Sequence, residues 1–178
     1  MVYRILSIED LDQILFLEYQ MYWQKKGWQE LWKNRGEKLF RNMIKEYLVN
    51  FPRGCFGVFD EKEGLSGVMI ISKISEVKTI PYIHSFKDYF EESGNIAYVQ
   101  IFAIKNCKKE VKIAKDLYRG VEKMAKTNEC NKIVVVIYSS LVEEAVLKQF
   151  GYKIERDDLR WEIFPDKYVD CRIYTKTI

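Results

Sequence analysis

Hydrophobic residues recur along the chain at two spacings, which together predict a mixed order of strands and helices. Apolar side chains three or four residues apart are typical of helices, and short apolar runs between turn residues are typical of strands. The pattern predicts strands over Val2–Leu6, Cys55–Phe59, Leu65–Ile74, Ile96–Ile104, Lys132–Tyr138, Leu159–Phe164 and Tyr168–Lys176. It predicts helices after Ser7, from about Gln29 to Tyr47, over Lys108–Lys126, and from Ser140 to Phe150.

The first helix presents an apolar face that includes Leu11, Ile14, Leu15 and Tyr22. Ser7 and Asp10 stand three residues apart before this face, which is the spacing of an acidic N-terminal cap. Gly27 then interrupts the helical pattern.

A long connection, Ser75–Asn95, separates the two halves of the chain. It contains Pro81, His84 and the acidic residues Glu91 and Glu92, and we expect a short helix around Phe86–Glu92. Long connections in compact domains are often functional.

The second half predicts a strand, a helix and a strand in succession, over Ile96–Ile104, Lys108–Lys126 and Lys132–Tyr138. Such units cross over in a right-handed sense and leave the two strands parallel. The helix from Ser140 begins with a capping box that ends at Glu143, and Gly151 follows it as a C-terminal cap. The fold class is therefore mixed α/β.

Composition narrows the class of protein. The chain has 178 residues, of which 48% are hydrophobic, with a net charge of +3, and we expect one globular domain over residues 1–178. No apolar run has the roughly 20 residues that a membrane span needs, and polar residues follow Ile5 too soon for a secretion signal. Four separated cysteines and one histidine predict neither a metal site nor disulfides, so we expect a cytoplasmic protein.

Four lysines, Lys105, Lys108, Lys109 and Lys112, gather where a strand passes into a helix. Lysine is unfavourable at a helix N-terminus, because the free amide protons and the macrodipole already make that end positive. The arrangement is explained if a phosphate or pyrophosphate binds there. Exposure of the lysines to solvent is the alternative explanation.

The order of elements resembles that of the GNAT superfamily of acyl-CoA-dependent N-acyltransferases, over essentially the whole chain. In that family an Arg/Gln-x-x-Gly-x-Gly/Ala loop follows the fourth strand, and Lys109-Glu110-Val111-Lys112-Ile113-Ala114 stands at this place. Ala114 matches the last position, Lys109 replaces the leading residue, and Lys112 replaces the middle glycine. Phe150-Gly151-Tyr152 is similar to the family's Leu-Gly-Phe/Tyr, and Tyr168–Lys176 resembles its closing strand.

The resemblance implies a GNAT-type fold, with a mostly antiparallel central sheet, one parallel pair and helices on both faces. It also implies that the backbone of Phe102, Ala103 and Ile104 binds the pantetheine arm of acetyl-CoA like an added strand. The cofactor would lie between the strands Ile96–Ile104 and Lys132–Tyr138. The residues implied to hold the pyrophosphate are Lys109, Glu110, Val111, Lys112, Ile113 and Ala114.

The positions where many family members carry a glutamate base and a tyrosine acid hold Gln100 and Leu147. Gln100 cannot take a proton. Its side-chain amide either orients the acceptor or forms hydrogen bonds with backbone groups of the sheet. A base can instead come from Glu76, His84, Glu91 or Glu92, or the acceptor can bind already neutral. Tyr138 is a candidate donor to the leaving thiolate, and Cys107 follows the ordinary pattern of an unreactive thiol.

The resemblance implies transfer of an acetyl group to a primary amine of a small molecule or peptide. Trp23 and Trp28 are the candidates for contact with this acceptor. Two alternatives stay open, namely an inactive acyl-CoA-binding module and a nucleic-acid-binding domain that uses Lys105–Lys115. The small net charge and the lack of aromatic residues among these lysines disfavour nucleic acid, and we expect no membrane partner and a monomer or homodimer.

Overall fold

The computed structural model describes all of the chain except residues 26, 63, 74–93, 139 and 165. His84, Glu76, Glu91, Glu92 and the expected helix around Phe86–Glu92 lie outside the described residues. The described chain divides into two compact units, Met1–Ile70 with Ile101–Leu117, and Ile71–Gln100 with Tyr118–Ile178.

The strands form a seven-stranded sheet in the order β1-β2-β3-β4-β5-β7-β6. β4 and β5 pair in parallel, as predicted, whereas β1 with β2, β2 with β3, β5 with β7, and β6 with β7 are antiparallel. The fold class is thereby confirmed. The strands are β1 (Val2–Ile5), β2 (Cys55–Asp60), β3 (Gly64–Lys73), β4 (Ile96–Ile104), β5 (Lys132–Ile137), β6 (Lys153–Phe164) and β7 (Lys167–Thr177).

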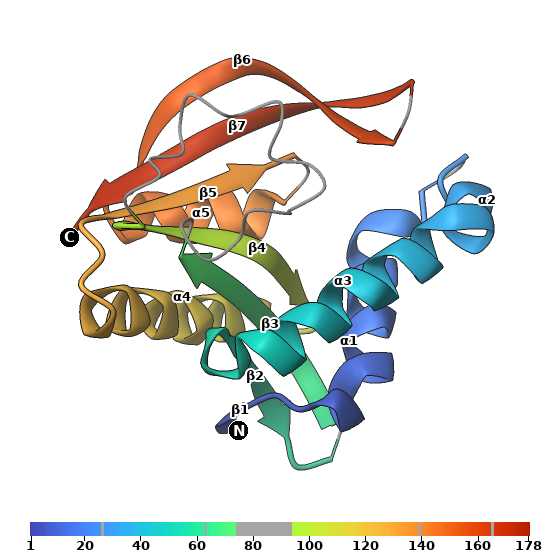
Figure 1. Ribbon diagram of the computed structural model, residues 1–178, viewed down its shortest axis with the longest axis horizontal. Coiled ribbons are helices and arrows are strands. Elements are labelled where there is room, and N and C mark those ends of the chain that lie inside the picture. Colours follow the sequence, from blue (N-terminus) through green and yellow to red (C-terminus); the bar gives the residue numbers. More distant parts are fainter. Residues whose placement is uncertain (26, 63, 74–93, 139, 165) are drawn as a thin grey trace. The chain divides into compact units, whose positions relative to one another are not determined.

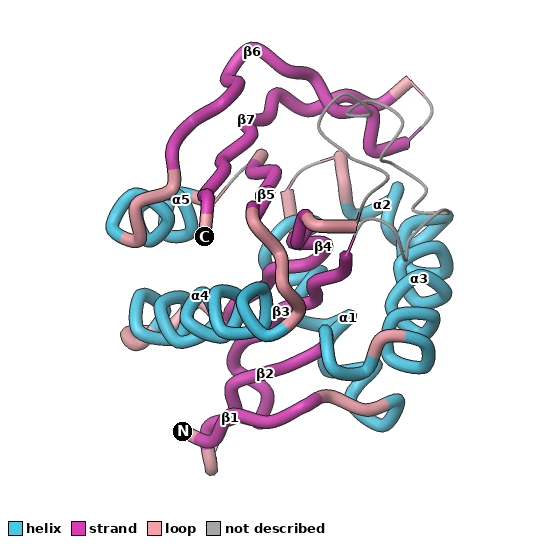
Figure 2. The backbone as a smooth tube through the Cα atoms, turned by 60° about the vertical axis from the view of Figure 1, so that its left-hand side comes forward, coloured by secondary structure: helices cyan, strands magenta, loops and turns pink. Residues whose placement is uncertain are grey.

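The helices of the first unit follow β1. They are the 3-10 helix η1 (Ile8–Asp10), α1 (Leu11–Glu18), the π-helix η2 (Tyr19–Trp23), α2 (Gln29–Leu31), the π-helix η3 (Trp32–Gly36), α3 (Glu37–Asn50) and the 3-10 helix η4 (Pro52–Gly54). The predicted cap is confirmed, because the Asp10 carboxylate accepts the Ser7 amide at 2.8 Å. α1 packs against α3 (Figure 2).

The helix α4 (Glu110–Thr127) begins close against β3 in the first unit. A Cβ atom at Gly67 of β3 would lie 2.4 Å from Cγ2 of Ile113 and 3.1 Å from Cδ1 of Leu117. Because real Cβ atoms do not approach other atoms this closely, glycine at this position is what allows α4 to lie so near the strand.

The second unit carries the remaining part of α4 and the helix α5 (Leu141–Gln149). The Ser140 hydroxyl accepts the amide of Glu143 at 3.1 Å, and Gly151 has a φ of +78°, so the Ser140 bond of the predicted capping box and the predicted Gly151 cap are confirmed. The Glu143 carboxylate accepts a hydrogen bond from the buried Tyr118 hydroxyl. Lys176 donates to the Phe150 carbonyl and to Glu122, both at 2.6 Å.

β6 and β7 form a long antiparallel ribbon (Figure 1). β6 begins at Lys153, whereas the hydrophobic pattern predicted a start at Leu159. The added residues are charged or exposed, and residues 153–158 are exposed throughout. A strand at a sheet edge needs no buried face along its whole length, so the apolar pattern missed this part.

No helix in the described ranges is both long enough and apolar enough to cross a membrane.

Candidate functional site

The lysine-rich junction lies between β4 and α4, in the first unit. Lys109 Nζ lies 3.0 Å from Asp60 Oδ2, and Lys112 Nζ lies 2.8 Å from Asp116 Oδ2. Both lysine side chains stay largely exposed, at 59% and 63%. Two cations therefore stand at a helix start, each held by a carboxylate that a phosphate group could replace.

A cavity of about 270 Å³ lies at the same junction. Lys108, Lys109 and Cys107 line it together with Asp60 and Ser66. The Lys62 amide and the Lys109 ammonium hold the pKa of Asp60 below its usual range. The junction thus offers a hollow beside cationic side chains rather than a flat surface.

The second half of β4 presents one edge to β3 and the other edge away from it. The Lys105 amide donates to the Ser66 carbonyl of β3 at 2.9 Å. Because backbone groups of successive strand residues point to opposite edges, the Phe102 carbonyl and the Ile104 amide face away from β3. These are the atoms that an added strand would use.

Two side chains of η2 form hydrogen bonds with these backbone atoms. The Tyr22 hydroxyl donates to the Phe102 carbonyl at 2.9 Å, and the Ile104 amide donates to Met21 Sδ at 3.4 Å. Thioether sulfur is a weak acceptor. A ligand amide and carbonyl can replace both contacts with bonds of equal or better quality, so the edge fits an extended amide chain.

The residues expected to hold the pyrophosphate fall into a buried group and an exposed group. Ile113 and Ala114 are 1% and 0% exposed and anchor the helix, whereas Val111 and Lys112 face solvent. The first N–H groups of a helix have no intrahelical acceptor. The Glu110 amide donates to the Cys107 carbonyl and the Ile113 amide donates to the Lys109 carbonyl, so a phosphate here would use the other amides of the first turn and the lysines, with the Lys112 side chain where the family has glycine.

Gln100 and Leu147 are both placed in the second unit. Gln100 Nε2 donates to the Ser72 hydroxyl at 2.9 Å, and Leu147 is fully buried. Gln100 therefore serves the sheet through Ser72 in this structure, and a role in orienting an acceptor stays a prediction. The register of β4 with β5 runs from Ile96–Lys132 to Val99–Val135.

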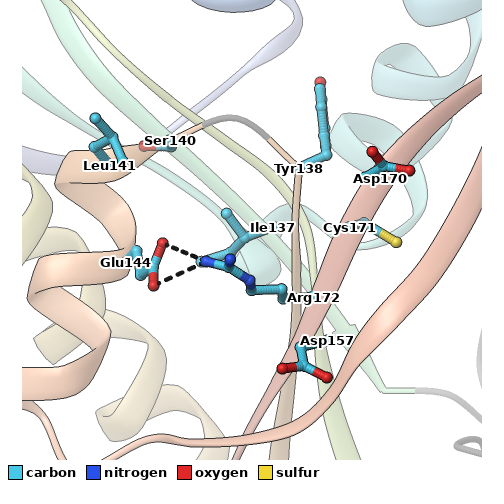
Figure 3. A pocket seen from close by; sticks show the side chains of 9 residues that line it. All are labelled: Ile137, Tyr138, Ser140, Leu141, Glu144, Asp157, Asp170, Cys171 and Arg172. Carbon is cyan, nitrogen blue, oxygen red and sulfur yellow. Dashed lines mark hydrogen bonds and ion pairs between the residues drawn. The ribbon is translucent and has the colours of Figure 1, made fainter.

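A second cavity, of about 310 Å³, lies beside the start of α5 and the strand β7 (Figure 3). Arg172 in this cavity is held by both carboxylate oxygens of Glu144, each at 3.2 Å. Asp157 and Asp170 also line it. Because its carboxylates outnumber its arginine, this cavity suits a cation better than a phosphate.

Tyr138, the predicted donor to a thiolate, lines the second cavity. Its ring packs edge-on against Trp161 with centroids 5.4 Å apart. The contact orients the ring, and the donor role stays a prediction.

The predicted acceptor-side tryptophans belong to an aromatic cluster in the first unit. Trp23 is 1% exposed and packs against Trp28, Trp32 and Phe40 at centroid distances of 5.5, 5.1 and 5.5 Å. Trp28 is half-buried. Packing accounts for Trp23, whereas Trp28 keeps a surface that a ligand can reach.

Sequence reasoning missed two residues of the site, Met21 and Tyr22, and a buried carboxyl on the helix just before them, Glu18. Tyr22 was expected on the apolar face of its helix, but its hydroxyl contact with β4 was not. Glu18 is 3% exposed, and burial raises its pKa to about 8, an effect that the nearby Trp23 indole opposes. The sequence did contain a signal for the burial of Glu18, because this residue lies four positions after Ile14 on the apolar face of the helix.

The described ranges contain no group of three or more potential metal ligands.

Comparisons with known proteins bear on the fold. No family model matches the chain, and no curated protein matches it in sequence. Solved structures do match over nearly its full length. PaiA N-acetyltransferase from Thermoplasma acidophilum, in complex with coenzyme A, superposes with a TM-score of 0.67 at 19% identity, covering 99% of this chain and 98% of that one.

Two further structures agree with it. A probable acetyltransferase from Staphylococcus epidermidis has a TM-score of 0.67 at 15% identity, covering 99% of this chain and 98% of that one. Drosophila melanogaster polyamine N-acetyltransferase has a TM-score of 0.66 at 9% identity, with 99% of each chain covered. This chain has the GNAT fold. At these identities the GNAT likeness establishes the architecture alone.

Proposed function

We propose that this protein is an acyl-CoA-dependent N-acyltransferase that moves an acetyl group from acetyl-CoA to a primary amine. The acceptor is a small molecule or a peptide. We expect no nucleic-acid or membrane partner, and a cytoplasmic monomer or homodimer.

The observation that carries the proposal is the pairing of two features within the first unit. An outward strand edge at Phe102 and Ile104 leads directly into a helix start with two exposed lysines. An extended amide chain that ends in a pyrophosphate matches both features in the same order. That is the chemical layout of coenzyme A.

Each residue then has a role that its position supports. The Phe102 carbonyl accepts a pantetheine amide and the Ile104 amide donates to a pantetheine carbonyl. The first turn of α4, with Lys109 and Lys112, stabilises the pyrophosphate charge. The thioester supplies the acyl group, and an amine nitrogen attacks its carbonyl carbon.

The alternative function is an acyl-CoA-binding module without transfer activity. Gln100 bonded to Ser72, and a buried leucine at position 147, support this alternative because neither can exchange a proton. Calorimetric titration with acetyl-CoA, followed by a thiol-release assay over a panel of primary amines, separates the two. Binding with turnover supports the enzyme, binding without turnover supports the module, and no binding contradicts both.

Reversing two charges at the helix start tests the phosphate site. Lys109→Glu/Lys112→Glu is expected to weaken acetyl-CoA binding at least tenfold, about 1.4 kcal/mol, because the helix start then repels the pyrophosphate. Lys38→Glu/Lys45→Glu on α3 makes the same change of net charge at exposed positions and should leave the Kd unchanged. Equal affinities for the two double variants, measured by calorimetry, would remove the phosphate-site assignment.

Removing one hydroxyl tests the strand edge. Tyr22→Phe is expected to tighten acetyl-CoA binding about three- to tenfold. In this variant the ligand no longer has to break the hydrogen bond between the Tyr22 hydroxyl and the Phe102 carbonyl before it binds. Tyr3→Phe, at a half-exposed tyrosine of β1, is the matched control. An unchanged or weaker Kd in Tyr22→Phe would mean that the ligand does not use this carbonyl.

A further inference from the structure

Glu18 is a buried carboxyl that the proposed binding site leaves without a role. It ends α1 and is 3% exposed. Its titration is governed by burial and by the Trp23 indole, and no lysine, arginine or carboxylate of the described chain contributes to it. Burying a carboxyl with no cation beside it lowers stability, so such a residue marks a candidate functional position.

The backbone around Glu18 is also unusual. The helix widens to a π-helix immediately after it, over Tyr19–Trp23. Short π-helical insertions are rare in proteins overall, and those that occur are often found at functional sites. The insertion here delivers Met21 and Tyr22 to the two outward atoms of β4.

Glu18 and Tyr22 lie four residues apart, so they share one face of this helix. Long helical side chains lean toward the N-terminus, which places the Tyr22 ring over the turn that carries Glu18. Tyr22 in turn bonds to the Phe102 carbonyl of β4. The Glu18 carboxyl therefore belongs to the same face of the first unit as the strand edge assigned to the acyl carrier.

We propose that Glu18 is the general base that accepts the proton of the acceptor amine during acyl transfer. This inference rests on the proposed function. When the pantetheine takes the Phe102 carbonyl from Tyr22, the Tyr22 side chain, which follows Glu18 by four residues on the helix, is free to move. In this proposal the movement of Tyr22 opens the Glu18 carboxylate to the acceptor amine.

The step balances as follows. The lone pair of the amine nitrogen forms a bond to the acyl carbon, and the carbon–sulfur bond breaks with its electron pair on sulfur. One nitrogen proton passes to the Glu18 carboxylate, which becomes a carboxylic acid. The thiolate takes a proton from solvent, and Glu18 returns its proton to solvent before the next turnover.

The deprotonated carboxylate of Glu18 is the form that accepts a proton, and burial raises its pKa to about 8 as long as the side chain stays covered. Activity is therefore expected to rise with pH toward a plateau, with an inflection at or below about pH 8, because uncovering the carboxylate relieves the burial that raises its pKa. A base whose pKa lies near the working pH is effective, because it takes a proton readily and also returns it.

Glu18→Gln tests the proposal, with Glu46→Gln at an exposed position of α3 as the matched control. Acetyl-CoA affinity is measured by calorimetry, and kcat is measured against pH with two primary amines of different basicity. An inflection that belongs to the protein stays in place when the amine changes. Folding of each variant is checked by circular dichroism and thermal unfolding.

We expect Glu18→Gln to lower kcat at least 100-fold, to keep the Kd for acetyl-CoA and to lose the inflection that Glu18 gives the wild-type pH profile. A variant that keeps kcat within threefold, with the inflection intact, overturns the role of Glu18 while the proposed function stands. A wild-type protein that binds acetyl-CoA but acylates no amine of the panel overturns both. If Glu18→Gln does not fold, Glu18→Asp replaces it, and an unshifted inflection in that variant overturns the proposal.

Discussion

Glu18→Gln is expected to remove a loss of stability that the wild-type protein suffers as the pH rises. The folded-state pKa of Glu18 is about 8, against an ordinary value of 4.5. Between these values the folded state holds a proton that the unfolded state has lost, so the free energy of unfolding falls as pH rises and is constant again above about pH 8. Over the full window the effect is about 5 kcal/mol, at about 1.4 kcal/mol per pKa unit.

Denaturant unfolding at pH 6 and at pH 9 measures this effect. Relative to Glu18→Gln, the wild-type protein should lose about 3 kcal/mol between these pH values. Any constant difference in packing or hydrogen bonding between the two proteins cancels in this comparison. Glu46→Gln should follow the wild-type curve, and a Glu18→Gln curve parallel to the wild type would show that Glu18 is already ionised at pH 6.

Gly67→Ala is expected to lower the free energy of unfolding by about 2 kcal/mol, a typical cost of overpacking a core. The added methyl group would lie 2.4 Å from Cγ2 of Ile113, a branch close to the backbone of α4 that cannot rotate away cheaply. Because α4 carries the lysines at its first turn, we also expect weaker acetyl-CoA binding.

A double-mutant cycle with Ile113→Ala isolates this contact. Ile113→Ala alone leaves a cavity, and Gly67→Ala should partly fill that cavity instead of clashing. The double variant should therefore lose at least 1 kcal/mol less free energy of unfolding than the sum of the losses in the two single variants. A coupling of this size lies within the range seen for residues in contact. Additive effects in urea unfolding would contradict the assigned contact between β3 and α4.

The repeating hydrophobic pattern was sufficient to predict most elements. The run Ile96–Ile104 and the crossover to Lys132 predicted the parallel pair, and Ser7, Ser140 and Gly151 predicted helix caps that the structure contains. These features depend on local periodicity and on short-range hydrogen bonds, which the sequence shows directly.

The features that escaped prediction depend on contacts between distant segments. The π-helix at Tyr19–Trp23 has the composition of an ordinary helix, and its Tyr22 and Met21 reach residues some 80 positions along the chain. No spacing rule reports such contacts. The start of β6 escaped for another reason, because pairing with β7 holds charged residues in a strand without burying them.

The two outer strands of the sheet differ in how they discourage pairing with another molecule. β6 spans 12 residues and begins with a run of exposed, mostly charged positions. β1 spans only 4 residues and exposes Val2, Tyr3 and Ile5 at 54%, 47% and 48%. The charged side chains of β6 and the short length of β1 thus each disfavour pairing with a strand of another molecule. Added salt screens the charges of β6 but does not change the length of β1.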